Sequence, residues 1–244
     1  MGGEKGVDSN AMSSTLTLVL PAHNEAGNIE RVVASFLDIQ DQIDFPLTIL
    51  IVDDGSSDAT GPICRKLAEN NPAIRCLHHG RNIGYGGALI SGFRASDGDY
   101  VAIADADGQF HPADFIRLLE YVEAYDVVVG CRHDRADPPG RRIMGRAWSL
   151  TGRWFFKIPI RDLNCGLKVF KRSIIANLSL QCVGPGINLE IMTHIVLAGI
   201  PIKEVLCSHF PRVVGDQSGG TLRVMSRALP ELLHVWRLKR GKGP

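Results

Sequence analysis

YVAIADADGQFHPA, at residues 100–113, joins a short apolar run, two acidic residues and the start of a helix. The β-branched run around Val101 and Ile103 predicts a buried strand, and Pro112 suits the first turn of a helix. Between them lies Asp105-Ala106-Asp107, where two carboxylates at a strand end repel each other unless a cation lies between them. This spacing indicates a divalent metal that carries phosphates, although an Asp-x-Asp taken alone is at least as typical of a surface turn.

Strand patterns alternate with helix patterns on both sides of this stretch. Short apolar runs predict strands at residues 16–20, 47–52, 74–77 and 126–129. Helical spacing predicts helices at residues 28–40, after 58, at 87–95 and at 112–124. Strands that are buried on both faces and joined by helices form a largely parallel sheet with helices on each side, so we expect an α/β fold.

The predicted strands end in polar residues at three places. These are Pro21-Ala22-His23-Asn24-Glu25, Asp53-Asp54-Gly55-Ser56 and Asp105-Ala106-Asp107. Ligands of parallel sheets bind beyond the carboxyl ends of the strands, so we expect these carboxylates to share one edge, where they need a cation or hydroxyl donors. The ribose, base and metal-bound diphosphate of a nucleotide sugar would supply those partners. A turn followed by a helix cap at Ser57 or Asp58 explains the second segment equally well.

The composition limits the class of protein. With 45% hydrophobic and 22% charged residues among 244, the chain is globular, with material for one large domain or two small ones. The net charge of +1 gives no overall attraction to polyanions, so we expect no nucleic-acid partner. The six cysteines lack the spacing of a zinc site, which indicates reduced thiols in the interior.

The two ends of the chain differ from its body. The polar N-terminus has no secretory pattern, which favours the cytoplasm, and Ser9-Asn10-Ala11 before Met12 is typical of residues left by cloning. We therefore assign residues 1–11 to an expression scar, 12–220 to one domain and 221–244 to a basic amphipathic helix with a tail. No stretch approaches the roughly 18 uninterrupted apolar residues that a membrane-spanning helix needs.

The C-terminal stretch at residues 222–238 carries apolar residues at helical spacing among arginines and lysines. The apolar residues are Leu222, Met225, Leu229, Leu232, Leu233 and Trp236. Such a helix either lies on anionic lipid, packs on the domain, or packs on a second copy of the chain in a homo-oligomer. The first arrangement would place the protein peripherally at the inner face of a membrane.

An alternating α/β sheet also suggests other enzymes. An NAD-binding dehydrogenase needs Gly-x-Gly after the first strand, but this turn reads His23-Asn24-Glu25-Ala26-Gly27. Gly84-Tyr85-Gly86-Gly87 follows the third strand instead, where it predicts a tight turn into a helix that approaches a phosphate or the sheet. A sugar nucleotidyltransferase would show a glycine-rich loop with Arg and Lys after the first strand. A catalytically silent subunit would lack the Asp-x-Asp.

Six motifs occur together in an order that characterises one family. They are PAHNE (21–25), IVDDGSSD (51–58), RNIGYGGALISGF (81–93), ADADGQFHP (104–112), VVGCR (128–132) and DLNCGLKVFKR (162–172). With these motifs the chain resembles the family 2 glycosyltransferases of the GT-A fold, most closely the dolichyl- or polyprenyl-phosphate mannose synthase branch. The resemblance implies an inverting transferase that uses Mg²⁺ or Mn²⁺ to move a hexose from a GDP-mannose or UDP-glucose type donor to a polyprenyl phosphate. A soluble or sugar-hydroxyl acceptor is the alternative.

The resemblance also implies roles for individual residues. Nucleotide contacts correspond to Pro21, Ala22, Asn24, Glu25, Asp53, Asp54 and Asp105. Metal ligands correspond to Asp105, Asp107 and Gln109. Catalytic residues correspond to Asp107, Asp162, Glu190 and Arg132, with Gly166 in the acceptor-side loop. Acceptor phosphate contacts correspond to Arg212 and Ser218, but Gly219 stands where the family usually has a lysine, a departure that affects one phosphate contact.

Residues 132–160 are predicted to form a mobile acceptor-side region in which arginines precede aromatic residues. These residues are Arg141, Arg142 and Arg146, then Trp148, Trp154, Phe155 and Phe156. A basic strip beside aromatic rings suits a lipid acceptor with an anionic head, while the solvated face of an amphipathic helix with buried aromatics explains the same pattern. A phosphate acceptor is ionised near pH 7 and needs no strong base. A hydroxyl acceptor needs a carboxylate, for which Asp162 and Glu190 are the candidates.

Overall fold

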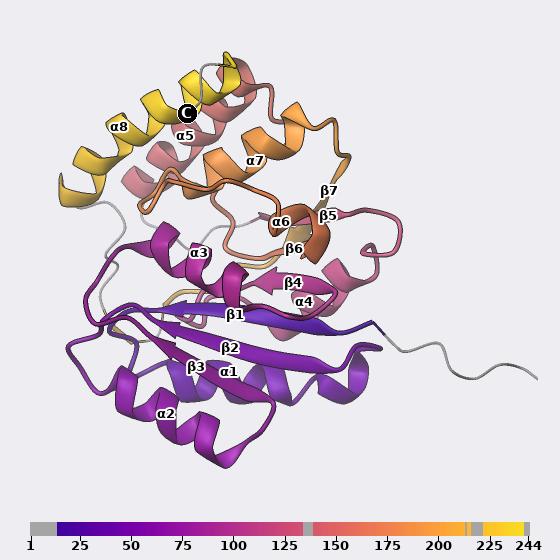
Figure 1. Ribbon diagram of the computed structural model, residues 1–244, viewed down its shortest axis with the longest axis vertical. Coiled ribbons are helices and arrows are strands. Elements are labelled where there is room, and N and C mark those ends of the chain that lie inside the picture. Colours follow the sequence, from indigo (N-terminus) through magenta and orange to yellow (C-terminus); the bar gives the residue numbers. More distant parts are fainter. Residues whose placement is uncertain (1–13, 134–138, 213, 216–221, 242–244) are drawn as a thin grey trace, which may run out of the picture.

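One seven-stranded sheet forms the centre of the molecule, with helices on both faces (Figure 1). The computed structural model describes residues 14–133, 139–212, 214–215 and 222–241. The strands are β1 (Leu16–Ala22), β2 (Leu47–Asp53), β3 (Ile74–His78), β4 (Tyr100–Ile103), β5 (Val127–Arg132), β6 (Lys168–Lys171) and β7 (Ile202–Cys207). The helices are α1 (Ile29–Leu37), η1 (Gln40–Gln42), α2 (Thr60–Asn70), α3 (Tyr85–Ala95), α4 (Pro112–Leu119), α5 (Pro139–Phe156), α6 (Arg172–Ile175), α7 (Ile187–Leu197) and α8 (Leu222–Lys239).

The strand order is β3-β2-β1-β4-β6-β5-β7, which confirms the predicted mostly parallel α/β sheet. β1 runs parallel to both β2 and β4, with Ala22 opposite Asp53 and Val19 opposite Ile103. This register brings the carboxyl ends of β1, β2 and β4 to one edge, so the three polar segments meet as predicted. β6 lies antiparallel between β4 and β5, a reversal that the sequence pattern did not indicate.

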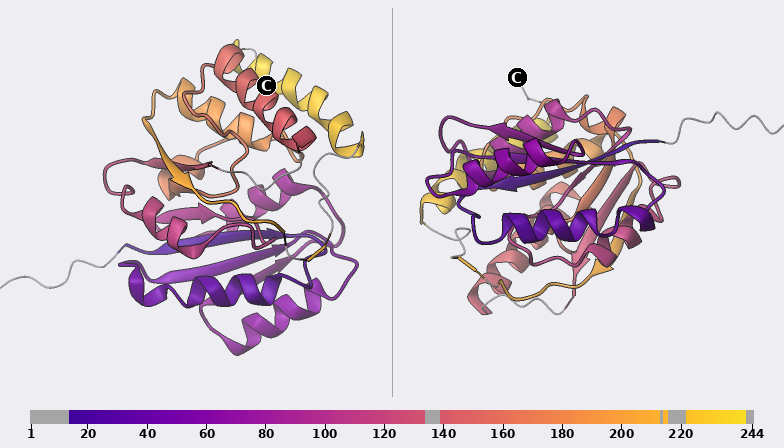
Figure 2. Two further views of the ribbon diagram at one scale, coloured as in Figure 1. Left: turned by 180° about the vertical axis from the view of Figure 1, so that it is seen from behind. Right: turned by 90° about the horizontal axis from the view of Figure 1, so that it is seen from below.

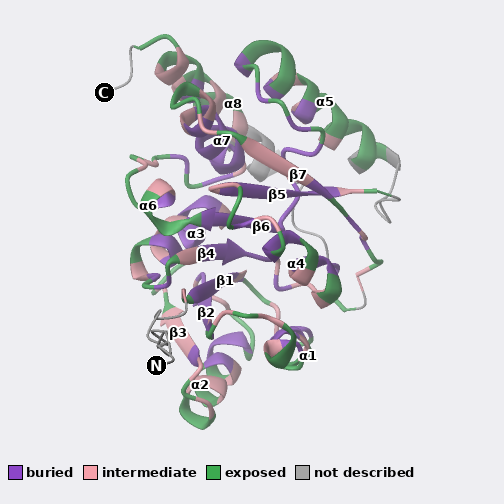
Figure 3. Ribbon diagram, turned by 90° about the vertical axis from the view of Figure 1, so that its right-hand side faces the viewer, coloured by how far each residue is buried: buried purple, intermediate pink, exposed green. Residues whose placement is uncertain are grey.

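Alternate residues of each strand enter two hydrophobic cores, one on each face of the sheet. Leu18 and Leu20 of β1 belong to the core that α1, α2 and α4 complete, whereas Val19 belongs to the core that α3, α5 and α7 complete. Phe36 of α1 and Phe115 of α4 meet edge to face, with ring centroids 5.4 Å apart. Both sides of the strands are therefore buried, while the outer sides of the helices are exposed (Figure 3).

Two stretches outside the parallel core also have a defined structure. The helix α5 occupies most of the stretch that was expected to be mobile, and α8 confirms the predicted C-terminal helix. Figure 2 shows α5, α7 and α8 together on one side of the sheet.

The six cysteines are free thiols, and all except the partly exposed Cys76 are buried, as predicted. Among the helices of the described residues, none combines the length and apolar character needed to cross a membrane.

Candidate active site

Asp105 and Asp107 follow β4 at the carboxyl edge of the sheet. Asp105 accepts a hydrogen bond from the Tyr85 hydroxyl at 3.2 Å, and Asp107 accepts the Gln109 backbone N–H at 3.0 Å. A Cβ atom on Gly166 would lie 2.1 Å from an Asp105 carboxylate oxygen, so only glycine lets the loop before β6 pass this close. The start of α3 and the loop before β6 therefore enclose the Asp-x-Asp turn.

The electrostatics of this turn suit a bound cation. Burial raises the pKa of Asp107 to about 7, and the neighbouring charge of Asp105 adds to the rise. Burial and the same aspartate raise the pKa of Tyr85 well above its ordinary value, so the phenol stays protonated as a donor. Two mutually repelling carboxylates are a donor set that fits Mg²⁺ or Mn²⁺, because a divalent ion removes the repulsion. Gln109 donates its side-chain N–H to the Phe210 carbonyl at 2.9 Å, which leaves its Oε1 to offer to the same ion.

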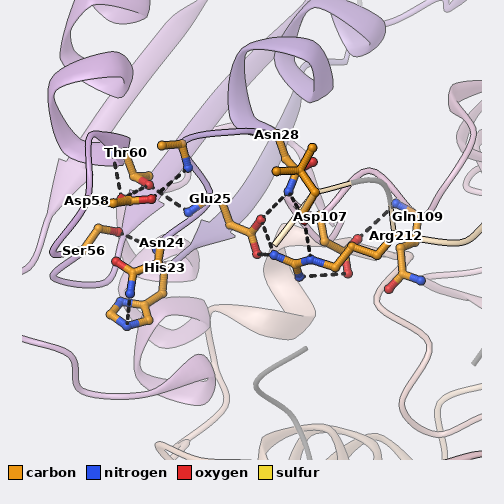
Figure 4. Close-up of polar contacts among 12 residues, drawn as sticks. His23, Asn24, Glu25, Asn28, Ser56, Asp58, Thr60, Asp107, Gln109 and Arg212 are labelled. Carbon is orange, nitrogen blue, oxygen red and sulfur yellow. Dashed lines mark hydrogen bonds and ion pairs between the residues drawn. The ribbon is translucent and has the colours of Figure 1, made fainter. Parts of the chain in front are cut away.

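Arg212 connects the end of β1 with the Asp-x-Asp turn (Figure 4). Its Nη2 lies 2.8 Å from both Glu25 carboxylate oxygens, and its Nη1 lies 4.0 Å from Asp107 Oδ2. Asn28 Nδ2 donates to Glu25 at 2.8 Å and to the Val214 carbonyl at 3.1 Å, which holds the segment after β7 against the start of α1. The guanidinium thus lies beside the metal candidates, where the charge of a diphosphate would develop.

The Asp54 carboxylate is engaged by protein donors. It accepts the backbone N–H groups of Ile83 at 3.0 Å and Gly84 at 2.8 Å, and His79 Nδ1 lies 2.8 Å from it. The residue is 3% exposed. In this arrangement Asp54 fixes the turn from β3 into α3, which carries Tyr85 toward Asp105, so we infer a positioning role in addition to the predicted nucleotide contact.

The neighbouring Asp53 and the loop after β1 hold each other by similar contacts. Asp53 accepts the Ser56 N–H at 3.0 Å, and its other oxygen lies 2.7 Å from His78 Nδ1. Asn24 donates its backbone N–H to the Ser56 hydroxyl at 2.9 Å (Figure 4). Its side-chain oxygen accepts the Ser57 N–H at 2.8 Å. These contacts hold the two loops together. The alternative of a helix cap at Ser57 or Asp58 is only partly met: Ala59 is the N-cap residue of α2, while the Asp58 carboxylate accepts the Thr60 N–H at 2.9 Å.

Two predicted catalytic residues form an ion pair with each other. Arg132, at the end of β5, places Nε 2.6 Å and Nη2 2.9 Å from the two Asp162 oxygens. Burial opposes the charge on Arg132, but the hydrogen bonds that it donates to Asp162 and the negative charge of that carboxylate together outweigh burial and raise the pKa of the guanidinium above its ordinary value. Because both oxygens of Asp162 are engaged by one guanidinium, this carboxylate is poorly arranged to take a proton from a hydroxyl acceptor.

Glu190 lies in the first turn of α7 and is fully buried. It accepts the N–H groups of Gln181 at 3.0 Å and Cys182 at 2.8 Å, and lies 2.7 Å from His234 Nε2 of α8. Cys182, Glu190 and His234 place their ligand atoms within 4.8 Å of one another. However, two atoms that both coordinate one metal ion at ~2 Å lie farther from each other than Glu190 Oε1 lies from His234 Nε2, which is 2.7 Å. The Glu190 carboxylate therefore serves the packing of α8 on α7.

The residues predicted to contact the nucleotide or the metal meet at the carboxyl edge. They are Pro21, Ala22, Asn24, Glu25, Asp53, Asp54, Asp105, Asp107 and Gln109. Arg212, predicted to contact the acceptor phosphate, lies at the same edge. Arg142 is exposed in the first turns of α5. Ser218 and the side chain of Arg141 lie outside the described residues, so their acceptor contacts remain predictions.

Sequence reasoning missed two residues that shape the site, Tyr85 and His79. Tyr85 lies between the glycines of Gly84-Tyr85-Gly86-Gly87, which indicate a tight turn but not the partner of the phenol. His79 follows β3 at the same edge as the acidic segments and bridges Asp54 to Ser91, whose Oγ lies 2.9 Å from its Nε2. A polar residue directly after a parallel strand was the signal available for His79.

Curated relatives of this chain transfer sugars to lipid phosphates. It is 28% identical to the undecaprenyl-phosphate mannosyltransferase of Micrococcus luteus, covering 83% of this chain and 87% of that protein. It is 27% identical to the polyprenol monophosphomannose synthase of Mycolicibacterium smegmatis, covering 93% of this chain and 89% of that protein. It is 28% identical to the undecaprenyl-phosphate 4-deoxy-4-formamido-L-arabinose transferase of Pseudomonas syringae, where the match covers 86% of this chain but only 62% of that longer protein.

Solved structures share the fold. Glucosyl-3-phosphoglycerate synthase from Mycobacterium tuberculosis, in complex with Mn²⁺ and UDP-glucose, has a TM-score of 0.71 at 21% identity, covering 95% of this chain and 80% of that one. Mannosyl-3-phosphoglycerate synthase from Rubrobacter xylanophilus has a TM-score of 0.69 at 19% identity, covering 93% and 75%. These similarities confirm the GT-A fold. The model of the family named Glycosyl transferase family 2 matches residues 17–178, and the chain therefore belongs to the family 2 glycosyltransferases.

Proposed function

We propose that this glycosyltransferase moves a hexose, with inversion, from a nucleotide-diphosphate sugar to a polyprenyl phosphate. The curated relatives named for undecaprenyl or polyprenol phosphate support this acceptor, and two of them are named for mannose transfer. The structural neighbour with Mn²⁺ and UDP-glucose supports a donor of the nucleotide-sugar class. A single displacement at the sugar C1 breaks its bond to the diphosphate and forms the bond to the acceptor oxygen.

On the donor side, Asp105, Asp107 and Gln109 would hold a Mg²⁺ or Mn²⁺ ion, which supplies charge neutralisation of the leaving diphosphate. Arg212 is the cationic side chain placed to assist, because its guanidinium already reaches from Glu25 to within 4.0 Å of Asp107. Tyr85, kept protonated, fixes Asp105 by a hydrogen bond. With such an ion bound, the ion and Arg212 would present positive charge to the diphosphate before the donor reacts, which is the arrangement that stabilises a transition state of this kind.

The acceptor assignment rests on one observation: both carboxylates that could act as bases are already engaged in hydrogen bonds within the protein. Asp162 is paired at two points with Arg132, and Glu190 is engaged by two backbone N–H groups and His234. A hydroxyl acceptor would have to give its proton to one of them. A phosphate monoester is already ionised near pH 7 and needs neither. The site therefore favours a phosphate oxygen as the nucleophile over a sugar hydroxyl.

A donor and acceptor screen tests the proposal by following released nucleoside diphosphate. GDP-mannose and UDP-glucose are each supplied with a short-chain polyprenyl phosphate in detergent, with 3-phosphoglycerate, or with a methyl glycoside, in the presence of Mg²⁺, Mn²⁺ or EDTA. We expect turnover only with the polyprenyl phosphate and a divalent ion, and Asp162→Asn should retain measurable turnover. Turnover with a hydroxyl acceptor that Asp162→Asn abolishes would contradict the acceptor assignment. Undiminished turnover in EDTA would contradict the metal.

A further inference from the structure

The outer side of α5 carries a stripe of exposed apolar residues. Ile143, Leu150 and Trp154 are 67%, 49% and 78% exposed, and their spacing of seven and four residues places them on one side of the helix. The opposite side faces the protein, where Ser149 and Phe156 are buried. A helix on the surface of a soluble protein normally exposes polar residues on its outer side, so the apolar stripe indicates a binding surface.

The helix α8 repeats this arrangement. Leu229, Leu233 and Trp236 are 64%, 48% and 43% exposed, at a spacing of four and three residues, whereas Val235 is fully buried against the domain. The guanidinium of Arg240 lies 4.4 Å from the centroid of the Trp236 ring. The helix therefore packs with one side and presents a second apolar stripe, bordered by a cation, on the other.

The two helices form one surface, which we call the two-helix face: Ile143, Leu150 and Trp154 of α5 with Leu229, Leu233 and Trp236 of α8. Lys239 of α8 donates to the Phe155 carbonyl, which caps the C-terminus of α5, and its ammonium lies 5.9 Å from the centroid of the Phe156 ring. Figures 1 and 2 show both helices along the same end of the molecule. The two apolar stripes are therefore held next to each other by direct contacts between α5 and α8.

The charged residues of the two helices are nearly all cationic. Residues 139–157 and 222–240 each contain five arginines or lysines, and together they contain a single carboxylate, Glu231. Glu231 is turned inward, because its oxygens accept the N–H groups of Gly184 at 2.6 Å and Gly186 at 2.7 Å. The exposed cations Arg153 and Arg237 therefore have no acidic residue on their own helices to neutralise them.

We propose that the two-helix face docks on an anionic lipid bilayer. Exposed leucine and tryptophan side chains beside arginines match the boundary between acyl chains and negatively charged headgroups, where the apolar groups sink in and the cations meet phosphate. A second copy of the chain is a poorer occupant, because a symmetric contact would bring two cationic faces together. The helix α5 begins at Pro139, seven residues after β5 ends at the carboxyl edge, so docking would bring the membrane near that edge. Only this last consequence, access to a lipid-linked acceptor, rests on the proposed function.

Co-sedimentation with vesicles tests the proposal without using activity. The full chain is mixed with vesicles of phosphatidylcholine alone or with 30% phosphatidylglycerol, at low and high salt. We expect binding to the anionic vesicles that salt weakens. The pair Arg153→Gln and Arg237→Gln, one on each helix, should lower the partition coefficient roughly 30-fold. The matched pair Lys66→Gln and Arg94→Gln, exposed on α2 and α3, should leave it unchanged.

A second double variant tests the apolar part. Trp154→Ala with Leu229→Ala removes the most exposed residue of the stripe on each helix and should reduce binding at least about tenfold, whereas the exposed Leu206→Ala on β7 should not. Thermal melting checks that each variant is folded. The proposal is overturned if no vesicle binds the wild type, if both vesicle types bind it equally, or if the variants abolish self-association instead of vesicle binding. Vesicle binding without turnover of any polyprenyl phosphate in detergent would contradict the proposed function and leave the docking surface standing.

Discussion

Two acidic pairs end neighbouring parallel strands of this protein, and the structure treats them differently. Asp53-Asp54 after β2 is met by protein donors: Asp54 by the N–H groups of Ile83 and Gly84 and by His79, Asp53 by Ser56 and His78. The pair after β4 also accepts donors, the Tyr85 hydroxyl at Asp105 and the Gln109 N–H at Asp107, but its two carboxylates lie beside each other and burial with this repulsion raises the pKa of Asp107 to about 7. The donors around the first pair make it an organiser of the loops, whereas the repulsion within the second pair favours a bound cation.

The largest expected effect is on turnover at the second pair. Asp107→Ala should reduce turnover about 10³-fold or more, because it removes a ligand of the ion that neutralises the leaving diphosphate. Nucleoside-diphosphate release measures this, and thermal shift with GDP or UDP should lose its dependence on Mn²⁺. The variant should remain folded, since the residue lies at a strand tip. Near wild-type turnover would remove Asp107 from the metal site.

Asp54→Ala should act mainly on stability. It leaves the buried N–H groups of Ile83 and Gly84 without their acceptor, and we expect a loss of roughly 3 kcal/mol in the free energy of unfolding. Urea denaturation of the metal-free protein measures the loss, with Asp107→Ala as the control that should not show it. Weaker nucleotide binding at unchanged stability would instead assign Asp54 to the nucleotide alone.

Replacing Arg212, which follows β7 and pairs with Glu25, tests whether this arginine contacts phosphate or only holds the protein together. Arg212→Ala should lower turnover by the equivalent of about 1.5–3 kcal/mol, since a charge-assisted contact to phosphate is lost. Glu25→Gln provides the matched change, because it releases the guanidinium from its ion pair without removing it. Kinetics with a polyprenyl phosphate that are the same for Arg212→Ala and wild type would make the arginine a structural residue.

The smallest expected effect concerns pH and the metal-free protein. The pKa of Asp107 lies above its unfolded value of 3.8, so the native state binds more protons between about pH 4 and 7 and loses stability as pH rises through this window. Asp107→Asn should therefore be the more stable protein at pH 8, with the difference vanishing toward pH 4. The full shift corresponds to roughly 4 kcal/mol. Because the side chain is 17% exposed and the variant also loses the attraction of Arg212, we expect on the order of 1 kcal/mol. Parallel pH profiles would contradict the raised pKa.

The strands β1 to β5 could be predicted from sequence because they read as short apolar runs. The parallel β7 could not, since Lys203 and Glu204 interrupt its pattern and most of its residues are only partly buried. The antiparallel β6 could not, since Lys168 interrupts its pattern. This lysine is fully buried and its ammonium donates to the Cys165 carbonyl and to Asn188 Oδ1, the latter at 3.0 Å, partners that exist only in the folded chain. The stretch at 132–160 was expected to be mobile because its prolines and arginines obscure the helical period of α5.

The order of the elements as far as β5, the edge at which the acidic residues collect and the family can be read from local periodicity and from contiguous motifs. The partner of each charged side chain depends on the folded chain. The pairing of Arg132 with Asp162, of Arg212 with Glu25 and of Glu190 with His234 joins residues that lie 30, 187 and 44 positions apart. Whether a carboxylate remains able to bind a cation or take a proton depends on the donors that folding brings within hydrogen-bond distance, and this is not encoded in the local sequence.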